Sequence, residues 1–242
     1  MKECPELGDE VRSVVFFVDA GLKRSQQMFA DLNRHAIRPT KSLGILYDRR
    51  DPLSQLACRL AENVSVFKNM TEMEKTSIPN RSNRLHTLGS IYQATRTLLG
   101  KSARCKISES GEQLATDFWE AVAKAIPDWQ LAAQKKVSCA ELRRDYIHAH
   151  GIALQALAIA GAALIAEHPR DWKRRLADLQ HVNWSRSNAE LWEGRALVGG
   201  RVSKALVNIV LTANLVKTHL GLELGPKEKQ LENRLLGDRQ AA

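Results

Sequence analysis

The sequence is poor in aromatic residues, and its cysteines are dispersed. Phe, Trp and Tyr make up 5% of the 242 residues, whereas 44% of the chain is hydrophobic and 26% is charged. Such a composition is typical of a globular chain with a sizeable core. Cys4, Cys58, Cys105 and Cys139 form no CxxC pair, which argues against a zinc motif and suits reduced thiols in a cytosol. We therefore expect a cytoplasmic chain that needs no metal.

The sequence also lacks a long uninterrupted apolar run and a visible secretory leader. Residues 1–10 are acidic and have no apolar stretch, unlike a signal peptide. Residues 147–166 approach the ~20 apolar residues that span a bilayer, but His148, His150 and Gln155 interrupt them. The segment therefore predicts a buried central helix and not a membrane span.

Positive charge is concentrated in one part of the chain. The formal net charge is +9, and residues 21–104 hold 15 Lys and Arg against 6 Asp and Glu. A concentrated basic region is the electrostatic footprint of a protein that binds a polyanion such as DNA. A solvated basic surface without a partner is the alternative interpretation.

The hydrophobic pattern predicts a mainly α fold of the α+β class. Residues 11–18 form a β-branched and aromatic run that predicts a buried strand, and a single strand needs pairing partners. Elsewhere the apolar residues recur at helical spacing. We expect an α/β fragment over residues 1–104 and an all-helical domain over residues 105–242, with the boundary in the polar segment 101–112.

Capping residues mark the expected helix starts. Thr40 or Ser42 can cap a short helix, and Asp51-Pro52 pairs an N-cap with a proline at the first helical position. Ser138 with Glu141 fits a capping box that would open one long helix ending near Pro169. The other expected helices are an amphipathic one over residues 23–35, one from residue 83 to residue 98, one over residues 114–126, a short basic one over residues 171–179, one after Gly199-Gly200 and one after Gly225-Pro226.

Basic side chains cluster at the predicted helix ends, beside hydroxyl and amide groups that also contact phosphates. The segment from Asn80 to Arg84 is equally compatible with a turn whose Asn and Ser side chains cap a helix while its arginines are merely exposed. The candidate DNA-binding residues are Arg34, Arg38, Lys41, Arg49, Arg50, Arg81 and Arg84.

A glycine-rich segment near the C-terminus is the nearest approach to a phosphate loop. Gly199, Gly200, Arg201 and Lys204 do not match the Walker pattern, but a glycine-rich entry to a helix can hold an anion. A flexible turn between packed helices is the alternative. His148 and His150 should diverge on a helix, and no Ser, Cys or His has a local partner that marks a nucleophile. We predict no catalytic residue and no cofactor.

Several segments resemble a known bacterial family. They are residues 29–43 (FADLNRHAIRPTKSL), 46–53 (LYDRRDPL), 71–76 (TEMEKT), 80–88 (NRSNRLHTL) and 91–95 (IYQAT), with a looser match at Trp192, residues 199–204 and residues 208–212. Together they resemble the DndB family of DNA phosphorothioation (DNA sulfur modification) systems. That family belongs to a wider DGQHR-domain group, which is similar to ParB-like folds. The residues that match the family motif are Phe29, Asp31, Asn33, Ser42 and Asp48.

The resemblance implies a DNA-binding negative regulator of DNA sulfur modification, with a partial ParB-like fragment at its N-terminus. The Asp-Gly-Gln-His-Arg motif of the wider group would precede Val11, and the sequence does not contain it. We therefore expect an N-terminally truncated chain in which any nucleotide-handling role of that motif is in doubt.

Two other functions stay open. The ParB-like relationship could bring nucleotide hydrolysis or nuclease activity, with Asp31, Asn33 and Asp48 near a phosphate. Alternatively, the helical domain could hold other sulfur-modification proteins in a complex. The expected partners are thus DNA, other proteins of the modification system and a second copy of the chain, without a membrane.

Overall fold

The computed structural model describes residues 26–27, 39–101 and 105–240. Contacts divide the chain into two units, Met1–Arg38 and Pro39–Ala242, and the following description concerns the second. The predicted strand over residues 11–18 lies outside the described residues. So does the predicted helix over residues 23–35, except for Gln26 and Gln27, which are helical.

The second unit is mainly helical, as the sequence predicts. Each of its described β-strands is only two residues long, and they form two separate pairs. The elements are α2 (Lys41–Tyr47), α3 (Pro52–Asn63), β1 (Thr71–Glu72), β2 (His86–Thr87), α4 (Leu88–Leu98), α5 (Glu109–Ala125), α6 (Pro127–Ala133), α7 (Cys139–Asp145), η2 (Ile147–Ala149), α8 (Gly151–Glu167), α9 (Trp172–Arg175), η3 (Leu176–His181), α10 (Ala189–Trp192), β3 (Leu197–Val198), β4 (Arg201–Val202), α11 (Leu206–His219) and α12 (Pro226–Gln240).

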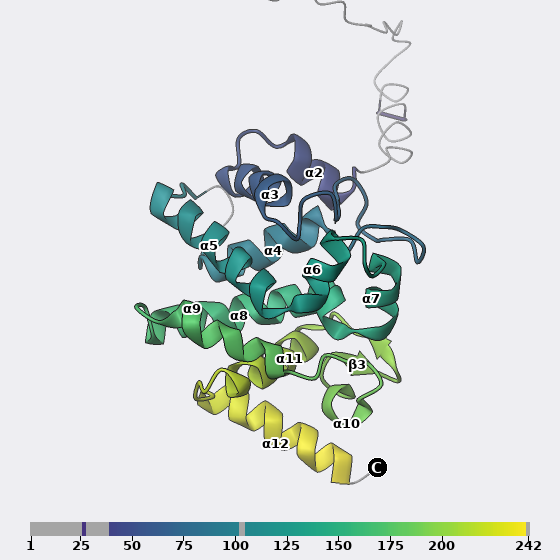
Figure 1. Cartoon of the computed structure of the whole chain (residues 1–242), viewed down its shortest axis with the longest axis vertical. Helices are drawn as coiled ribbons and strands as arrows, with labels where there is room; N and C mark the ends of the chain where they lie inside the picture. Colours follow the sequence, from purple (N-terminus) through teal and green to yellow (C-terminus); the bar gives the residue numbers. More distant parts are fainter. Residues whose placement is uncertain (1–25, 28–38, 102–104, 241–242) are drawn as a thin grey trace, which may run out of the picture. The chain divides into compact units, whose positions relative to one another are not determined.

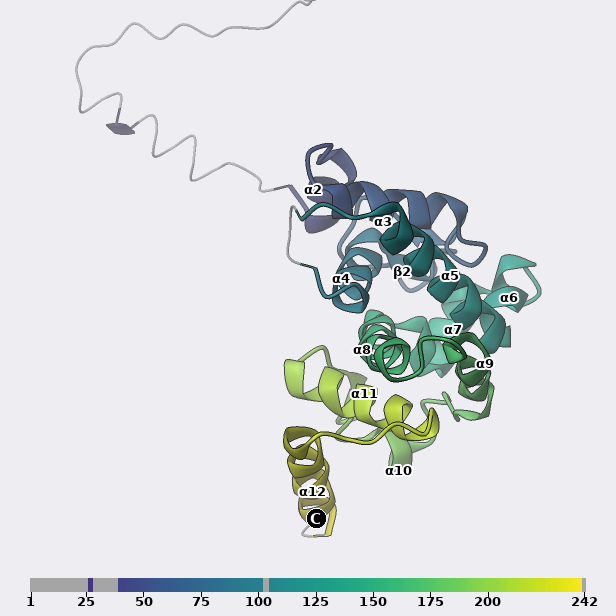
Figure 2. The same cartoon turned by 90° about the vertical axis from the view of Figure 1, so that its left-hand side faces the viewer.

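Helix α8 is the central element of this unit. It lies between α4 on one side and α11 on the other (Figures 1 and 2), and α12 packs on α11. Its side chains are mostly Ala, Leu and Ile, and nine of its 17 residues are buried. A helix that is apolar all round belongs in a protein core. No helix in the described part of the chain combines the length and the apolarity that crossing a membrane requires.

Several local signals are confirmed. The Thr40 side chain accepts from the Leu43 N–H at the start of α2, and Asp51 caps α3 with Pro52 as its first residue. Ser138 and Glu141 form the predicted capping box. These caps satisfy N–H groups that have no partner within the helix.

Two helix starts differ from the prediction. Helix α4 begins at Leu88 and not near residue 83, because Thr87 and Ser90 form a capping box there. Residues 86–87 instead form β2, which pairs in parallel with β1. Helix α5 begins at Glu109, because the Ser108 side chain caps it. The apolar spacing of Leu85 and Leu88 is compatible with a helix that starts near residue 83 and also with a short strand followed by a helix that starts at Leu88.

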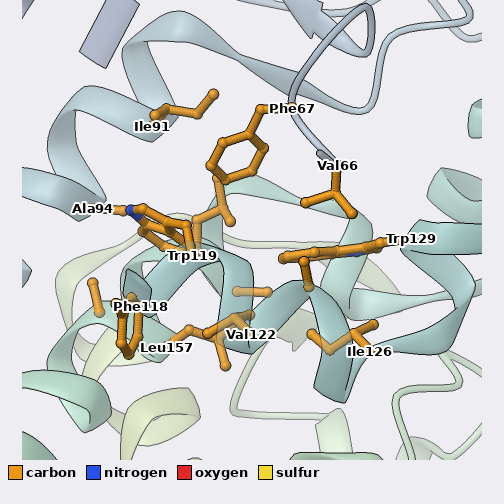
Figure 3. Close-up of a cluster of buried hydrophobic side chains, with 14 of the residues drawn as sticks. Val66, Phe67, Ile91, Ala94, Phe118, Trp119, Val122, Ile126, Trp129 and Leu157 are labelled. Carbon is orange, nitrogen blue, oxygen red and sulfur yellow. The ribbon is translucent and has the colours of Figure 1, made fainter. Parts of the chain in front are cut away.

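One aromatic core joins α4, α5 and α6 (Figure 3). The Phe67 ring lies 5.5 Å from the Trp119 ring and 6.4 Å from the Trp129 ring, measured between centroids. The Trp119 indole N–H donates to Thr95 Oγ1 at 3.1 Å, so that its one polar atom is satisfied inside the core. Side chains from both sides of segment 101–112 share this core. The division into domains at residue 104 stays a prediction.

Candidate anion-binding cavity

A cavity of about 540 Å³ opens at the N-terminal ends of α4 and α8. Segments that are far apart in the sequence form its wall: the loop before α4, helix α7, the start of α8, and single side chains from near β3 and β4. The described residues that line it are Thr76, Ser77, Ile78, Asn80, Leu85, His86, Thr87, Ser90, Ala140, Glu141, Arg143, Arg144, Ala149, His150, Gly151, Arg186 and Lys204.

The cavity exists because the chain breaks between α7 and α8. The sequence predicts one helix from Ser138 to Pro169, and this prediction is wrong. Tyr146 and His150 have extended backbone conformations, Tyr146 pairs with Ser185, and the Ile147 N–H donates to the Trp184 carbonyl at 2.9 Å. These bonds to a distant segment replace helical ones, and α8 therefore starts at the cavity.

The first turn of α8 faces the cavity without a side-chain cap. Its N-cap residue, His150, makes no capping bond; its Nε2–H donates to the Arg143 carbonyl at 2.8 Å instead. The exposed end of the helix dipole and the first N–H groups of a helix, which have few partners within it, give such a terminus a partial positive charge. Gly151 is the first residue of the helix, and a Cβ built there would lie 3.1 Å from Ser90 Cβ and 3.9 Å from Lys204 Nζ. The Lys204 ammonium group thus lies beside the positive end of a helix.

Two arginines hold the wall together through backbone carbonyls. Arg143 donates to the carbonyl groups of Pro79, Asn80 and Ser82 at 2.9–3.0 Å and to that of Arg84. Partial burial lowers the pKa of Arg143. Because carbonyl groups carry no formal charge, these bonds position the guanidinium and leave its positive charge in place.

Arg186 also lines the cavity and also binds backbone carbonyl groups. Its guanidinium donates to the carbonyl groups of Arg143 and Arg144 at 3.3 and 3.1 Å, and to that of Gly200 at 3.0 Å. It therefore joins helix α7 to the hairpin β3–β4. Among the described residues, neither Arg186 nor Lys204 has an ion-pair partner.

The cavity is positive overall. Four of its described lining residues are cationic and one, Glu141, is acidic. The Glu141 carboxylate accepts from the Ser138 N–H and hydroxyl at 3.0 and 2.8 Å, which lowers its pKa. Arg144 pairs with Asp145. Glu141 and Asp145 thus form no ion pair with Lys204 or Arg186, although the hydrogen bond from Arg144 and the nearby Arg186 charge lower the pKa of Asp145.

His86 is the most buried polar residue of the wall. It is only 2% exposed, and neither ring nitrogen has a hydrogen-bond partner among the described residues. The edges of the ring lie against Phe67 and Trp129, at centroid distances of 6.0 and 5.1 Å. Burial, reinforced by the neighbouring His148, His150 and Arg143, lowers the pKa of His86 to about 3. The neutral ring offers one N–H donor and one acceptor.

His148 is not among the residues that line the cavity. The sequence predicts that it diverges from His150 on a helix, but neither residue is α-helical, and the two side chains bind different groups. The Trp129 indole N–H donates to His148 Nδ1 at 3.1 Å, so that His148 Nε2 carries the proton and donates to Asp128 at 3.0 Å. These two hydrogen bonds satisfy both ring nitrogens of the buried His148. The described residues contain no group of His, Cys, Asp and Glu that could hold a metal ion.

The predicted DNA-binding residues take several positions. Lys41, Arg49, Arg50 and Arg81 are exposed and form no ion pair with any described residue. Arg84 is also exposed, but its guanidinium donates to the Asn69 carbonyl. Arg34 and Arg38 lie outside the described residues. The structure thus places Arg81 and Arg84 on the loop that Arg143 holds, whereas Arg49 and Arg50 lie between α2 and α3.

The described family-motif residues stabilise loops. The Ser42 hydroxyl is buried and donates to the Lys75 carbonyl at 3.0 Å. Asp48 Oδ1 accepts from the N–H groups of Arg50 and Asp51 at 2.9 and 3.1 Å. This contact orders the turn before α3. Phe29, Asp31 and Asn33 lie outside the described residues.

Gly199 and Gly200 form the turn of the β3–β4 hairpin. Their φ angles are +57° and +70°, a conformation that favours glycine at both positions. Their N–H groups do face an anion, the carboxylate of Glu193 within the same chain. Arg201 is exposed, whereas Lys204 belongs to the cavity. An external anion at the glycines stays a prediction, and Glu193 would have to leave for it to bind.

Sequence reasoning missed His86, Arg143, Arg144 and Arg186 as members of a common site. They lie on segments far apart in the sequence, so no short motif identifies them as one site. The one sequence signal is that His86 falls in segment 80–88 and Lys204 in segment 199–204, two of the segments that carry the family resemblance.

Comparison with known families supports that resemblance directly. The model of the DndB family, described as DNA-sulfur modification-associated, matches residues 1–223. The chain belongs to the DndB family. No curated protein and no solved structure matches it. Family membership connects the chain with DNA sulfur modification, and the cavity and the exposed basic residues are features of a member of that family.

Proposed function

We propose that the chain is a DNA-binding negative regulator of a DNA sulfur modification system. The observation that supports DNA binding most strongly is a set of exposed cationic side chains without carboxylate partners among the described residues: Lys41, Arg49, Arg50 and Arg81. Cations that are not neutralised within the protein remain free to replace the counterions of a phosphate backbone.

The loop that carries Arg81 is held at both ends. Near its start, the hydroxyls of Thr40 and Ser42 donate to the carbonyl groups of Glu74 and Lys75. Near its end, Arg143 binds four carbonyl groups of residues 79–84. A fixed loop loses less conformational entropy when a ligand binds. Lys41, beside the first anchor, and Arg81, beside the second, are therefore suitable positions for phosphate contacts.

A salt titration with matched variants tests the proposal. The affinity of the full chain for a labelled DNA duplex is measured by fluorescence anisotropy at several salt concentrations. We expect Arg49→Gln with Arg50→Gln to weaken binding to all sequences alike. The log–log salt slope should fall by about 1 for each phosphate that these arginines no longer neutralise.

The double variant Lys227→Gln with Lys229→Gln removes two exposed charges of α12 and is the control for net charge. Equal losses of affinity in both double variants would mean that only net charge matters. Absence of binding by the unaltered chain at low salt would refute the proposal.

The regulatory part of the proposal rests on family membership and needs a test in cells. A reporter under the promoter of the sulfur modification genes should be less active when the chain is present, and the Arg49/Arg50 variant should relieve this repression. Equal reporter activity with and without the chain would contradict negative regulation. Such a role also places the chain with the chromosome, in the cytoplasm.

A cluster of exposed apolar side chains supports a second candidate function, in which the chain is a subunit that binds other sulfur-modification proteins. Val198, Leu206 and Val207 are 55%, 76% and 45% exposed, and all three lie at or near the β3–β4 hairpin. Apolar contacts persist at high salt, where phosphate contacts weaken. This function would be favoured if the modification proteins co-purified with the unaltered chain at high salt and did not co-purify with the double variant Leu206→Ser, Val207→Ser.

A further inference from the structure

We propose that the cavity at the start of α8 binds the phosphoryl group of a small free ligand of about mononucleotide size. This proposal does not depend on DNA binding. The cavity volume of about 540 Å³ falls within the range of roughly 300–1,000 Å³ that is typical of small-molecule sites.

The arrangement of charge favours a phosphoryl group. Lys204 Nζ lies close to Gly151, at the positive end of a 17-residue helix, and a cation at that end is unfavourable unless an anion lies between them. The Arg186 guanidinium adds a second positive charge that forms no ion pair with a described carboxylate. Uncapped helix N–H groups together with Lys and Arg form the usual surroundings of bound phosphate.

His86 supplies independent evidence for a ligand. Buried polar atoms in native proteins are almost always hydrogen-bonded, yet both nitrogens of this ring, which is 2% exposed, lack a partner in the part of the chain that the structure describes. The ring lines the same cavity as Lys204. A phosphoryl oxygen that reached this ring would accept from the His86 N–H.

Burial of His86 also favours a small ligand over duplex DNA. The phosphates of a duplex lie on a broad cylinder, whereas His86 belongs to a concave wall in which Arg143 and Arg186 are fixed to backbone carbonyls. A free phosphorylated molecule can enter such a cavity, which His86 and Lys204 both line.

Binding of inorganic phosphate and of AMP to the full chain, measured by isothermal titration calorimetry, tests the proposal. We expect both to bind, AMP more tightly, and Lys204→Met to raise the dissociation constants at least about tenfold, as for the loss of one charged hydrogen bond. Lys204 is exposed, so this variant should keep the fold, as circular dichroism would show. Lys227→Met on α12 is the charge-matched control and should bind like the unaltered chain.

Three results would overturn the proposal. The first is that neither ligand binds at about 10 mM, so that any dissociation constant lies above the millimolar range. The second is that Lys204→Met binds both ligands with unchanged affinity. The third is that a DNA duplex competes fully with the ligands and that Lys204→Met loses DNA affinity to the same extent. The last result would make the cavity a DNA phosphate contact and would leave the proposed DNA-binding function standing. Conversely, loss of DNA binding only in the Arg49/Arg50 variant would support two separate sites.

Discussion

Gly161 of α8 lies directly against the ring of Phe118 of α5, and this contact leaves no room for a side chain. A Cβ built on Gly161 would overlap the Phe118 ring atoms Cε2 and Cζ. Both residues are buried, and α8 is the central helix of the unit. The packing of the Phe118 ring on α8 therefore depends on the missing Cβ.

Replacing Gly161 with alanine should destabilise the protein in spite of the higher helix propensity of alanine. Overpacking a core typically costs about 1–3 kcal/mol, which outweighs a propensity gain of about 1 kcal/mol. Gly44, inside α2, has no atom within 4 Å of a built Cβ, so Gly44→Ala should stabilise the protein slightly. Urea denaturation of both variants checks the prediction, and a stabilised Gly161→Ala would contradict the packing argument.

Local signals in the sequence predicted the helix starts at Thr40, Asp51 and Ser138, because a cap and the N–H groups that it binds lie within four residues. The two-residue strands at Thr71 and His86 escaped prediction, since two residues show no periodicity.

The break before α8 escaped prediction for a different reason. Apolar spacing continues from Leu142 through Ile147, and the bonds that end α7 come from Trp184 and Ser185, about forty residues away. The cavity depends on that break, so its composition could not be predicted from local pattern.

Buried neutral histidines should make the protein sensitive to acid well above the pKa of its carboxylates. The folded-state pKa values of His86 and His150 are about 3 and about 4, whereas an unfolded histidine titrates near 6.5. Their stabilising contribution is therefore complete above about pH 6.5 and is lost as pH falls, by up to about 1.4 kcal/mol per pH unit for each ring.

The variant His86→Phe isolates one of these contributions. It should unfold at an equal or higher urea concentration at pH 7.5, because two unsatisfied nitrogens are gone, and it should lose stability less steeply between pH 6.5 and 4.5. His181→Gln, at an exposed position, controls for the loss of an imidazole. A pH dependence identical to that of the unaltered chain would refute the assignment.

The ion pair of Arg195 with Glu232 should be essential for the attachment of α12. Two parallel bonds of 2.7 and 2.5 Å join the side chains, which are only 11% and 16% exposed. Asn214 also donates to Glu232 at 3.0 Å. Because Glu232→Leu leaves a buried guanidinium without its partner, we expect a cost of about 3–5 kcal/mol, seen as early hydrogen exchange in α12. The more exposed pair Arg59–Glu112 is the control, and Glu112→Leu should cost no more than about 1 kcal/mol.

Arg143 should protect the loop of residues 79–84 from cleavage by a protease, because it holds the loop in one conformation. Its guanidinium is the common donor to four carbonyl groups of that loop, and hydrogen bonds to a charged group contribute about 1.5–3 kcal/mol. In Arg143→Met the open form of the loop should be at least about tenfold more populated, and trypsin, which cleaves after arginine, should cut after Arg81 and Arg84 correspondingly faster. Arg144→Met removes the neighbouring guanidinium, which is bonded to Asp145 and not to the loop, and cleavage should stay at the rate of the unaltered chain. Mass spectrometry of the early fragments distinguishes these sites from others, and equal cleavage rates in the two variants would show that the loop keeps its conformation without Arg143.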